Sequence, residues 1–198
     1  MNGATFAAKN DGLFGKAITF DGVNDWVQVQ SSSSLSALNA LTVSLWLRPD
    51  APVDCDGNNN YRFLIGKGNI ADGAWSLVFE EGEGFQARVR VGGEQRSVWA
   101  SAAAIPVGEW SEVGFTYDAA TGAMRFYANG ALVGSTDHPP GTLDATSHNL
   151  TIGGPGGARP ACPNGDGNFK GAIDEVRVSR VVRDLTIAGE PYDDTTVV

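Results

Sequence analysis

The run Gly171–Val178 reads Gly-Ala-Ile-Asp-Glu-Val-Arg-Val, and near the other end of the chain Phe20–Val29 reads Phe-Asp-Gly-Val-Asn-Asp-Trp-Val-Gln-Val. Both runs are short and rich in residues that favour strands, yet each carries an aspartate where a strand should be apolar. A buried, unpaired carboxylate is costly, so each aspartate needs a cation or hydrogen bonds. If the two runs pair as neighbouring strands, Asp21 and Asp174 could share one hard cation such as Ca²⁺.

Between these runs the dominant period of apolar residues is two, which is typical of strands with one buried face. The alternating runs are Val43–Leu47, Trp75–Phe79, Phe85–Val91, Val113–Tyr117 and Met124–Ala128. Asn129-Gly130 follows the last run and is the strongest short-range signal for a hairpin. About a dozen strands must split into two packed sheets. The sequence therefore predicts an all-β, two-sheet antiparallel sandwich, with a jelly roll favoured over an immunoglobulin pattern.

The composition fits one domain over residues 1–198, because 42% of the residues are hydrophobic and only 19% are charged. The formal net charge of −9 argues against nucleic acid as a partner, since phosphate contacts need clustered Lys and Arg. No apolar run approaches the roughly 20 residues of a membrane span, so we expect no membrane insertion. Because Met1–Ala4 lacks a basic start and no apolar segment follows, we expect no signal peptide in this sequence. We expect either a cytosolic chain or, as the favoured reading, a segment of a larger exported protein.

The chain has two cysteines, Cys55 and Cys162, and each lies in a polar loop. Buried free cysteines normally have apolar neighbours, so this setting favours a disulfide between them. In the chain-entropy model such a long loop gives about 4–5 kcal/mol of stabilisation. The alternative is two exposed thiols in a reducing compartment.

The same two loops gather polar side chains. Asp56 and Asn58 come from one loop, and Asn164 and Asp166 come from the other. If the disulfide forms, these groups converge into a second calcium site or a polar sugar site. The alternative is ordinary turn chemistry, because loops use Asp, Asn and Gly in any case.

Seven motifs in order carry a resemblance to a known family. They are Ala17–Val27, Leu41–Pro49, Phe63–Gly68, Gly108–Asp118, Met124–Gly130, Leu150–Gly154 and Phe169–Val178. Over about residues 12–185 the chain resembles a laminin G-like jelly-roll domain of the concanavalin A-like lectin/glucanase superfamily. The resemblance implies a binding module of a secreted or surface protein, for example a carbohydrate-binding domain, an adhesin segment or an interaction domain. It also implies a structural calcium ion between the first and last strands, with Asp21 and Asp174 at the matching positions and backbone oxygens of neighbouring residues completing the shell. From the sequence, Asn24 and Asp25 could contribute as well. The alternative is that Asp21 caps a β-turn and Asp174 pairs with an arginine.

The aromatic residues divide by their relation to these motifs. Trp46 and Trp110 lie inside motifs and are expected to pack in the core, and Trp75 shares a strand face with core residues. Trp99 and Tyr61 lie outside the motifs and are the candidates for stacking on a sugar ring.

Three arginines, Arg88, Arg90 and Arg96, could form a cationic patch for an acidic sugar. The alternative is a solvated sheet face on which Glu80 and Glu94 supply the counter-charges.

For catalysis the sequence offers little. A glycosidase needs two carboxylates on one face, whereas Asp174 and Glu175 are adjacent and a regular strand sends them to opposite faces unless a bulge intervenes. We therefore expect a non-catalytic, calcium-stabilised module that binds a polysaccharide or cell-surface glycan through loops at one edge. The alternatives are a protein–protein interaction domain without a sugar site and a catalytic jelly roll acting as a polysaccharide hydrolase or lyase.

Overall fold

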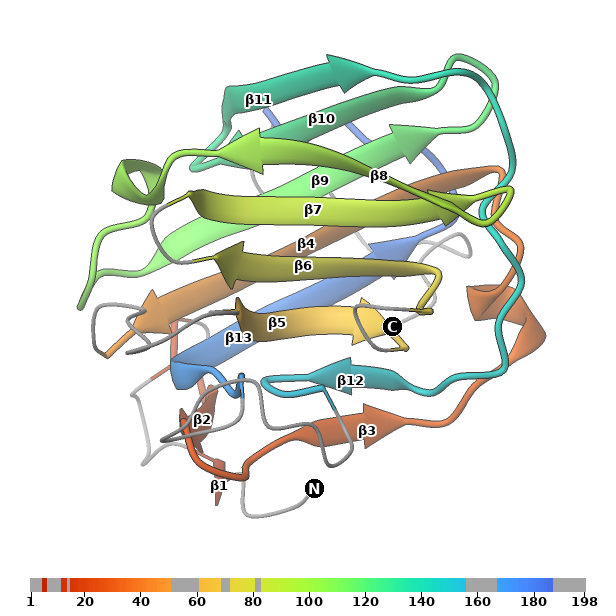
Figure 1. Cartoon of the computed structure of the whole chain (residues 1–198). Helices are drawn as coiled ribbons and strands as arrows, with labels where there is room; N and C mark the ends of the chain where they lie inside the picture. Colours follow the sequence, from red (N-terminus) through yellow and green to blue (C-terminus); the bar gives the residue numbers. More distant parts are fainter. Residues whose placement is uncertain are drawn as a thin grey trace.

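The computed structural model describes residues 5–6, 12–13, 15–50, 61–68, 72–80, 83–155 and 167–186. In these residues thirteen strands form two sheets that lie face to face, and every pair of neighbouring strands is antiparallel (Figure 1). The all-β, two-sheet antiparallel sandwich expected from the sequence is confirmed.

The seven-stranded sheet has the spatial order β1 (Thr5–Phe6), β2 (Ile18–Asp21), β13 (Lys170–Ser179), β4 (Ala40–Pro49), β9 (Ser111–Asp118), β10 (Ala123–Ala128), β11 (Ala131–Asp137). The six-stranded sheet has the order β3 (Val27–Val29), β12 (Leu150–Ile152), β5 (Tyr61–Lys67), β6 (Trp75–Glu80), β7 (Gly84–Val91), β8 (Glu94–Ala100). Short 3₁₀ turns, η1 (Ser33–Leu35) and η2 (Ala102–Ala104), lie in the connections.

The last strand, β13, lies between β2 and β4 in the interior of the seven-stranded sheet. Residues from the two ends of the chain are therefore direct neighbours, with Ala172 opposite both Thr19 on β2 and Arg48 on β4. The pairing of Phe20–Asp21 with the start of the Gly171–Val178 run, which the acidic residues in the two runs suggested, is present.

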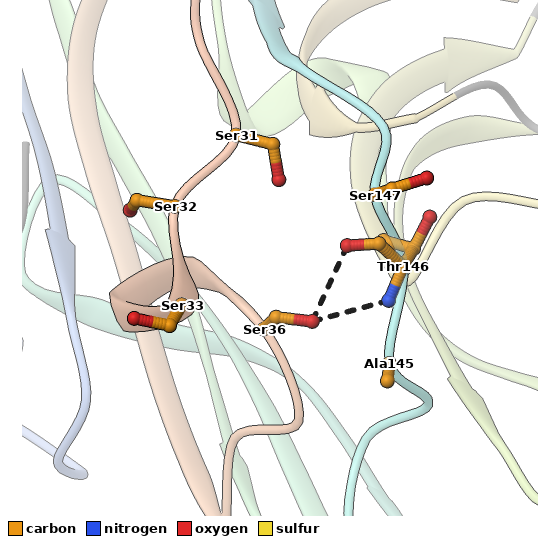
Figure 2. Close-up of a pocket in the computed structure, with 7 residues that line it drawn as sticks. All are labelled: Ser31, Ser32, Ser33, Ser36, Ala145, Thr146 and Ser147. Carbon is orange, nitrogen blue, oxygen red and sulfur yellow. Dashed lines mark hydrogen bonds between the residues drawn. The ribbon is translucent and has the colours of Figure 1, made fainter.

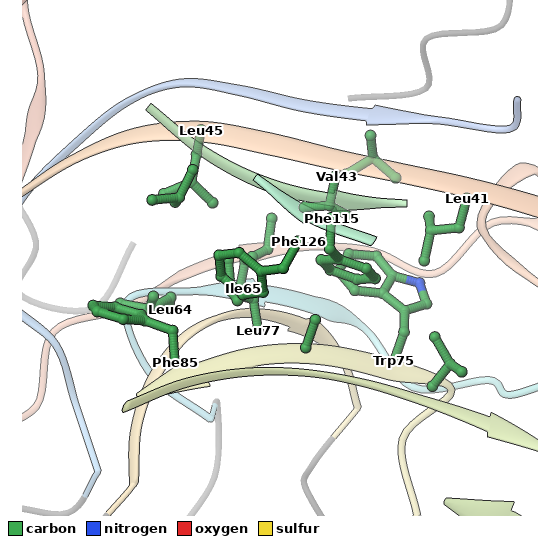
Figure 3. Packing of buried hydrophobic residues seen from close by; sticks show 14 of the residues in the cluster. Leu41, Val43, Leu45, Leu64, Ile65, Trp75, Leu77, Phe85, Phe115 and Phe126 are labelled. Carbon is green, nitrogen blue, oxygen red and sulfur yellow. The ribbon is translucent and has the colours of Figure 1, made fainter. Parts of the chain in front are cut away.

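The core forms between the sheets from the alternate apolar residues of each strand. Val43 and Leu45 on β4 are fully buried, and the rings of Trp75 on β6 and Phe115 on β9 pack with centroids 6.4 Å apart (Figure 3). Trp75 is a core residue with 2% of its surface exposed. Burial of these faces is the main favourable term for folding, and it fixes which side of each strand is left for other contacts.

The turn between β10 and β11 follows the hairpin signal. Asn129 has φ 49° and Gly130 has φ 76°, so both central residues adopt the left-handed conformation that a type I′ turn requires. The side chain of Asn129 also accepts a hydrogen bond from the Glu112 amide at 2.9 Å, which ties the turn to β9.

Gly134 on β11 allows the edge of one sheet to approach the edge of the other. A Cβ atom added to Gly134 would lie 2.1 Å from the backbone oxygen of Trp99 on β8. Such a contact with main chain cannot be relieved by a rotamer change, so only glycine permits this spacing between β11 and β8.

We expect Gly134→Ala to lower the free energy of unfolding by about 1–3 kcal/mol, because the added methyl group forces the two edges apart. Urea unfolding of both proteins would measure the difference. The control is Ser135→Ala, at the exposed neighbouring position, which should change stability little. Equal unfolding midpoints for Gly134→Ala and the unchanged protein would contradict the close approach.

Candidate functional site

The residues singled out from the sequence fall into two groups. Six of them, Cys55, Asp56, Asn58, Cys162, Asn164 and Asp166, lie outside the described residues, and so does the disulfide expected between the cysteines. The structure places the other four: Asp21, Tyr61, Trp99 and Asp174.

Asp21 and Asp174 lie on paired strands but not opposite one another. Asp21 is opposite Lys170, and Asp174 lies four residues further along β13. Four residues of strand correspond to about 13 Å between Cα atoms. Oδ1 of Asp174 accepts a hydrogen bond from the Glu175 amide at 3.0 Å. The structure therefore does not bring the two carboxylates together.

A different set of oxygen atoms converges next to Asp21. Asp25, with 6% of its surface exposed, accepts a hydrogen bond from the Asp21 amide at 2.9 Å. Asn168, equally buried, donates its side-chain N–H to the Val23 carbonyl at 2.6 Å. A Cβ atom at Gly154 would lie 2.1 Å from the side-chain oxygen of Asn168 and 3.2 Å from the Asp25 carbonyl. The β2–β3 turn and the start of β13 thus form a compact group of carboxylate, amide and carbonyl oxygens.

In the described part of the chain, no group of three or more His, Cys, Asp or Glu side chains is arranged to hold a metal ion. The group around Asp25 contains its carboxylate together with oxygens from Asn168 and the backbone. The neighbouring Asp21 carboxylate caps the turn, because its Oδ1 accepts hydrogen bonds from the Val23 amide at 2.8 Å and the Asn24 amide at 3.4 Å. Oxygen-only sets that mix carboxylates, amides and carbonyls are the chemistry that Ca²⁺ accepts.

Tyr61 and Trp99 lie on one face of the six-stranded sheet. Gln86 on β7 is opposite both Trp99 and Val78, and Glu80 on β6 is opposite Tyr61. Directly opposed residues share a face, and so do residues two apart on a strand, so these side chains all project away from the core. We call this strip of Tyr61, Glu80, Gln86, Arg88 and Trp99 the outer strip.

The polar members of the outer strip are bonded to one another. The Nε–H of Arg88 donates to the side-chain oxygen of Gln86, and its Nη2–H donates to Glu80 at 3.1 Å. The guanidinium carbon lies 4.7 Å from the centroid of the Tyr61 ring, a cation–π contact. Arg88 is 7% exposed and Gln86 is 4% exposed. This buried network holds the Tyr61 ring through its contact with Arg88, and the charge of Arg88 is balanced by Glu80.

Trp99 is the more exposed ring of the strip, with 37% of its surface accessible. It lies on β8, the outermost strand of the six-stranded sheet, and three strand spacings separate it from Tyr61 on β5. Those spacings, with an offset of two residues along the strand, put the two Cα atoms about 16 Å apart. Both rings reach the surface, since Tyr61 is partly exposed, whereas Gln86 and Arg88 between them are buried.

The three arginines do not form one patch. Arg88 is used within the outer strip, with Glu80 as its counter-charge as the alternative had it, but it is buried and does not lie on a solvated face. Arg96 is opposite Val89, whose side chain lies in the core, so Arg96 starts from the other side of the sheet, and it donates to the Pro139 carbonyl. Trp46 and Trp110 are both partly exposed. Trp110 packs against the buried residues Ala17 and Ala172, and Arg48 lies 5.4 Å from its ring centroid. The expected packing is therefore present for Trp110, beside a small cluster separate from the main core, whereas for Trp46 the expectation of core packing was wrong.

The catalytic alternative required a bulge at Asp174 and Glu175, because only a bulge could bring these two adjacent carboxylates to one face of the strand. Such a bulge is present, and Glu175 lies within it. The register of β13 against β4 shifts between Asp174 and Arg177, and Glu175 has φ 48°, a left-handed conformation that is uncommon outside glycine. The Glu175 carboxylate lies 3.5 Å from the Arg177 guanidinium. Burial raises the pKa of Glu112 on the neighbouring part of the sheet, and the Arg177 charge opposes that shift.

A shallow groove of about 610 Å³ lies at the other end of β5 from Tyr61, between the β3–β4 connection and the segment that leads into β12. Its lining is Ser31, Ser32, Ser33, Ser36, Ala145, Thr146 and Ser147, which we call the serine groove (Figure 2). Ser36 Oγ donates to the Thr146 carbonyl at 3.3 Å and accepts from the Thr146 amide at 3.1 Å, so it joins the two walls.

Lys67 at the end of β5 lies beneath this groove and has no exposed surface. Its ammonium group donates to Ser31 Oγ at 2.8 Å and to the His148 carbonyl at 2.6 Å. Burial lowers the pKa of Lys67 below its ordinary value. Sequence reasoning missed this residue, although a lysine two positions after the buried Ile65 on the same strand was a usable signal.

Comparisons with known proteins agree with the architecture. A family model, Laminin_G_3, described as the concanavalin A-like lectin/glucanases superfamily, matches residues 21–187. No curated protein sequence matches the chain.

Several solved structures share the fold. Domain 4 of AbnA, an extracellular GH43 arabinanase from Geobacillus stearothermophilus in complex with arabinotriose, is 23% identical, with 88% of this chain and 74% of that chain covered and a TM-score of 0.61. The CBM40 of the Ruminococcus gnavus IT-sialidase, bound to α2,3 sialyllactose, is 20% identical, with coverages of 85% and 91% and a TM-score of 0.61. Domains LG4-5 of the mouse laminin α1 chain are 16% identical, with coverages of 89% and 44% and a TM-score of 0.62.

Among the residues that the structure describes, no helix has the length and apolar character needed to cross a membrane.

We expect the lowered pKa of Lys67 to appear as a pH dependence of stability. A lysine whose folded-state pKa lies below its unfolded value binds fewer protons when folded, so its contribution to stability rises between the folded pKa and about 10.4. The free energy of unfolding, measured by urea titration across that alkaline window, should therefore rise more steeply for the unchanged protein than for Lys67→Met. Lys170→Met, at an exposed position, is the control. Parallel pH profiles for the unchanged protein and Lys67→Met would contradict the assignment.

Proposed function

Because this chain belongs to the Laminin_G_3 family of the concanavalin A-like lectin/glucanase superfamily, we propose that it is a non-catalytic carbohydrate-binding module. The observation that carries the proposal is the outer strip, where Tyr61 and Trp99 share one sheet face above a buried polar network. Aromatic faces and fixed polar groups together are what a sugar requires, since its rings are apolar on their faces and carry hydroxyl groups at their edges.

The geometry of the strip favours an extended glycan. Trp99 is exposed at the sheet edge, and Tyr61 is held by Arg88 about 16 Å away by strand spacing. Two anchors at this separation suit a polysaccharide or an oligosaccharide chain better than one sugar ring. The similar domains of the arabinanase and the sialidase were solved with oligosaccharides, which supports the ligand class and leaves the sugar open.

The loop residues remain part of the proposal. Tyr61 opens β5, directly after residues 51–60. Gly167 lies close to the same strand, because its carbonyl accepts a hydrogen bond from the Phe63 amide at 2.7 Å. Asp56, Asn58, Asn164 and Asp166 are proposed to add polar contacts at this end, with a Cys55–Cys162 disulfide joining the two loops.

We place the proposed structural Ca²⁺ beside Asp21 rather than between Asp21 and Asp174. Asp25 is a buried carboxylate with one hydrogen bond, and Asn168 brings an amide oxygen to the same turn. A bound Ca²⁺ would neutralise the two carboxylates and fix the β2–β3 turn against β13. Asp21, Asp25 and Asn168 are the side chains that would hold it.

A protein-interaction domain is the second candidate, and one observation favours it. Leu132 and Val133 on β11 are 52% and 37% exposed, and the neighbouring edge strand β8 carries Trp99. Exposed apolar side chains at a sheet edge are a frequent feature of protein contacts. On either reading the partners are extracellular, and the domain is proposed to be part of a larger surface or secreted protein.

The third reading, a catalytic jelly roll, has less support. The Glu175 carboxylate lies 3.5 Å from the Arg177 guanidinium, an ion pair that competes with a role in acid–base chemistry. We therefore propose no reaction for this domain.

We expect Trp99→Ala to weaken binding to a retained glycan by at least about tenfold, because it removes the exposed stacking surface. A glycan array identifies the ligand, and affinity electrophoresis measures the loss. Trp110→Ala is the matched control, since Trp110 lies outside the outer strip and contacts Arg48. Equal retention of the Trp99 variant and the unchanged protein would contradict the assignment of the outer strip as the glycan-binding surface.

We expect Ca²⁺ to raise the melting temperature and a chelator to lower it. At 100 times its dissociation constant a bound ion contributes about 2.7 kcal/mol of stability. Asp25→Asn should make melting insensitive to Ca²⁺, whereas Asp174→Asn should leave the response intact. The reverse pattern would support a site shared by Asp21 and Asp174. Identical melting temperatures of the unchanged protein with Ca²⁺ and with chelator would contradict a bound ion.

A further inference from the structure

We propose that the serine groove is a binding site for an anionic oxygen group, such as a carboxylate or a sulfate ester. This inference rests on Lys67 and the groove, and it stands whether or not the outer strip binds a glycan.

The first step is the uncompensated charge of Lys67. Its ammonium group is fully buried, and both of its hydrogen-bond partners, Ser31 Oγ and the His148 carbonyl, are neutral. Within the described residues it makes no ion pair with a carboxylate. A buried charge without a counter-charge is costly, and it creates a positive potential in its surroundings. An anion placed near it would recover part of that cost.

The second step is the position of Ser31, which joins the buried cation to the groove. Ser31 lines the groove, and its Oγ accepts the hydrogen bond from Lys67. Figure 2 shows its side chain directed toward the space between the two walls. The hydroxyl group uses a lone pair for Lys67, so its own proton is left for an acceptor in the groove. Because hydrogen bonds in a chain polarise one another, this proton is a stronger donor than that of an ordinary serine.

The third step is the chemistry of the lining. All seven lining residues are neutral: six carry a hydroxyl group and the seventh is Ala145, so none of them repels an anion. Two acids lie near the lining. Asp72 is 3.4 Å from the His148 ring nitrogen, and Asp144, which precedes Ala145, accepts hydrogen bonds from the Gly92 and Gly93 amides at 2.7 and 2.8 Å. Ser36 is already bonded to Thr146, which leaves Ser31, Ser33 and Ser147 as the donors with the fewest competing contacts.

The overall charge of −9 limits what such a site can attract. A polyanion would be repelled at long range, but this repulsion is screened within about 10 Å at moderate salt. The site is therefore suited to a single anionic group on an otherwise neutral molecule, for example one uronate or one sulfated sugar in a glycan.

The experiment is an NMR titration of the ¹⁵N-labelled protein with sodium glucuronate and, separately, with sodium sulfate. Glucose and sodium chloride at matched ionic strength are the reference titrations. We expect saturable shifts of the amides of Ser31–Ser36, Thr146 and Ser147 with at least one of the two anions. Shifts with glucuronate alone identify a carboxylate site, shifts with sulfate alone identify a sulfate site, and shifts with both identify a general oxyanion site.

Two variants test the origin of the binding. Lys67→Met should abolish the saturable shifts, and Ser31→Ala, which keeps the buried lysine, should weaken binding at least tenfold. Trp99→Ala should leave the shifts unchanged, which separates this site from the outer strip. Equal shifts with glucose or sodium chloride, or no saturable shift with either anion, would overturn the proposal. So would unchanged binding in a folded Ser31→Ala protein.

Discussion

The pairing of β13 with β2 and β4 is the constraint on which the rest of the structure depends. This strand is the last of those that the structure describes, yet it fills an interior position in the seven-stranded sheet, with hydrogen-bonded neighbours on both sides. It buries Ile173 and Val178 against the core and starts beside the β2–β3 turn. The same strand therefore completes the sheet, supplies part of the core and brings Asn168 against Val23.

The two sheets offer different surfaces for function. On the six-stranded sheet, the outward side chains of β5 to β8 form a connected strip in which Arg88 supports Tyr61 and balances Glu80. At the far end of β5, Lys67 joins Ser31 and His148, which belong to segments far apart in the sequence. One strand thus carries a supported aromatic residue at its start and a buried cation at its end. Rigid placement on a strand favours precise geometry in both places.

The fold was readable from the sequence because it depends on a local pattern. Alternation in Val43–Leu47 and Trp75–Phe79 identified buried faces, and Asn129-Gly130 identified a turn. The functional sites were harder to predict from the sequence, because they depend on which residues of neighbouring strands lie opposite one another. A period of two shows that Asp174 is in a strand, but not that Asp21 lies opposite Lys170 instead. Trp46 alternates with buried leucines, so the period of two places its side chain on the outer face of the sheet. The prediction of core packing for Trp46 did not follow this pattern. Lys67 was missed for a different reason, since a charged residue is normally expected at the surface and this one is buried.

The interior position of β13 has a consequence for synthesis of the protein. Until residues 170–179 leave the ribosome, β2 and β4 each have one unpaired edge, and the core lacks the apolar side chains that β13 supplies. Unpaired strand edges and uncovered apolar faces promote association with other chains, and contacts between distant residues form slowly. The nascent domain therefore exposes these strand edges and apolar side chains until β13 has been synthesised.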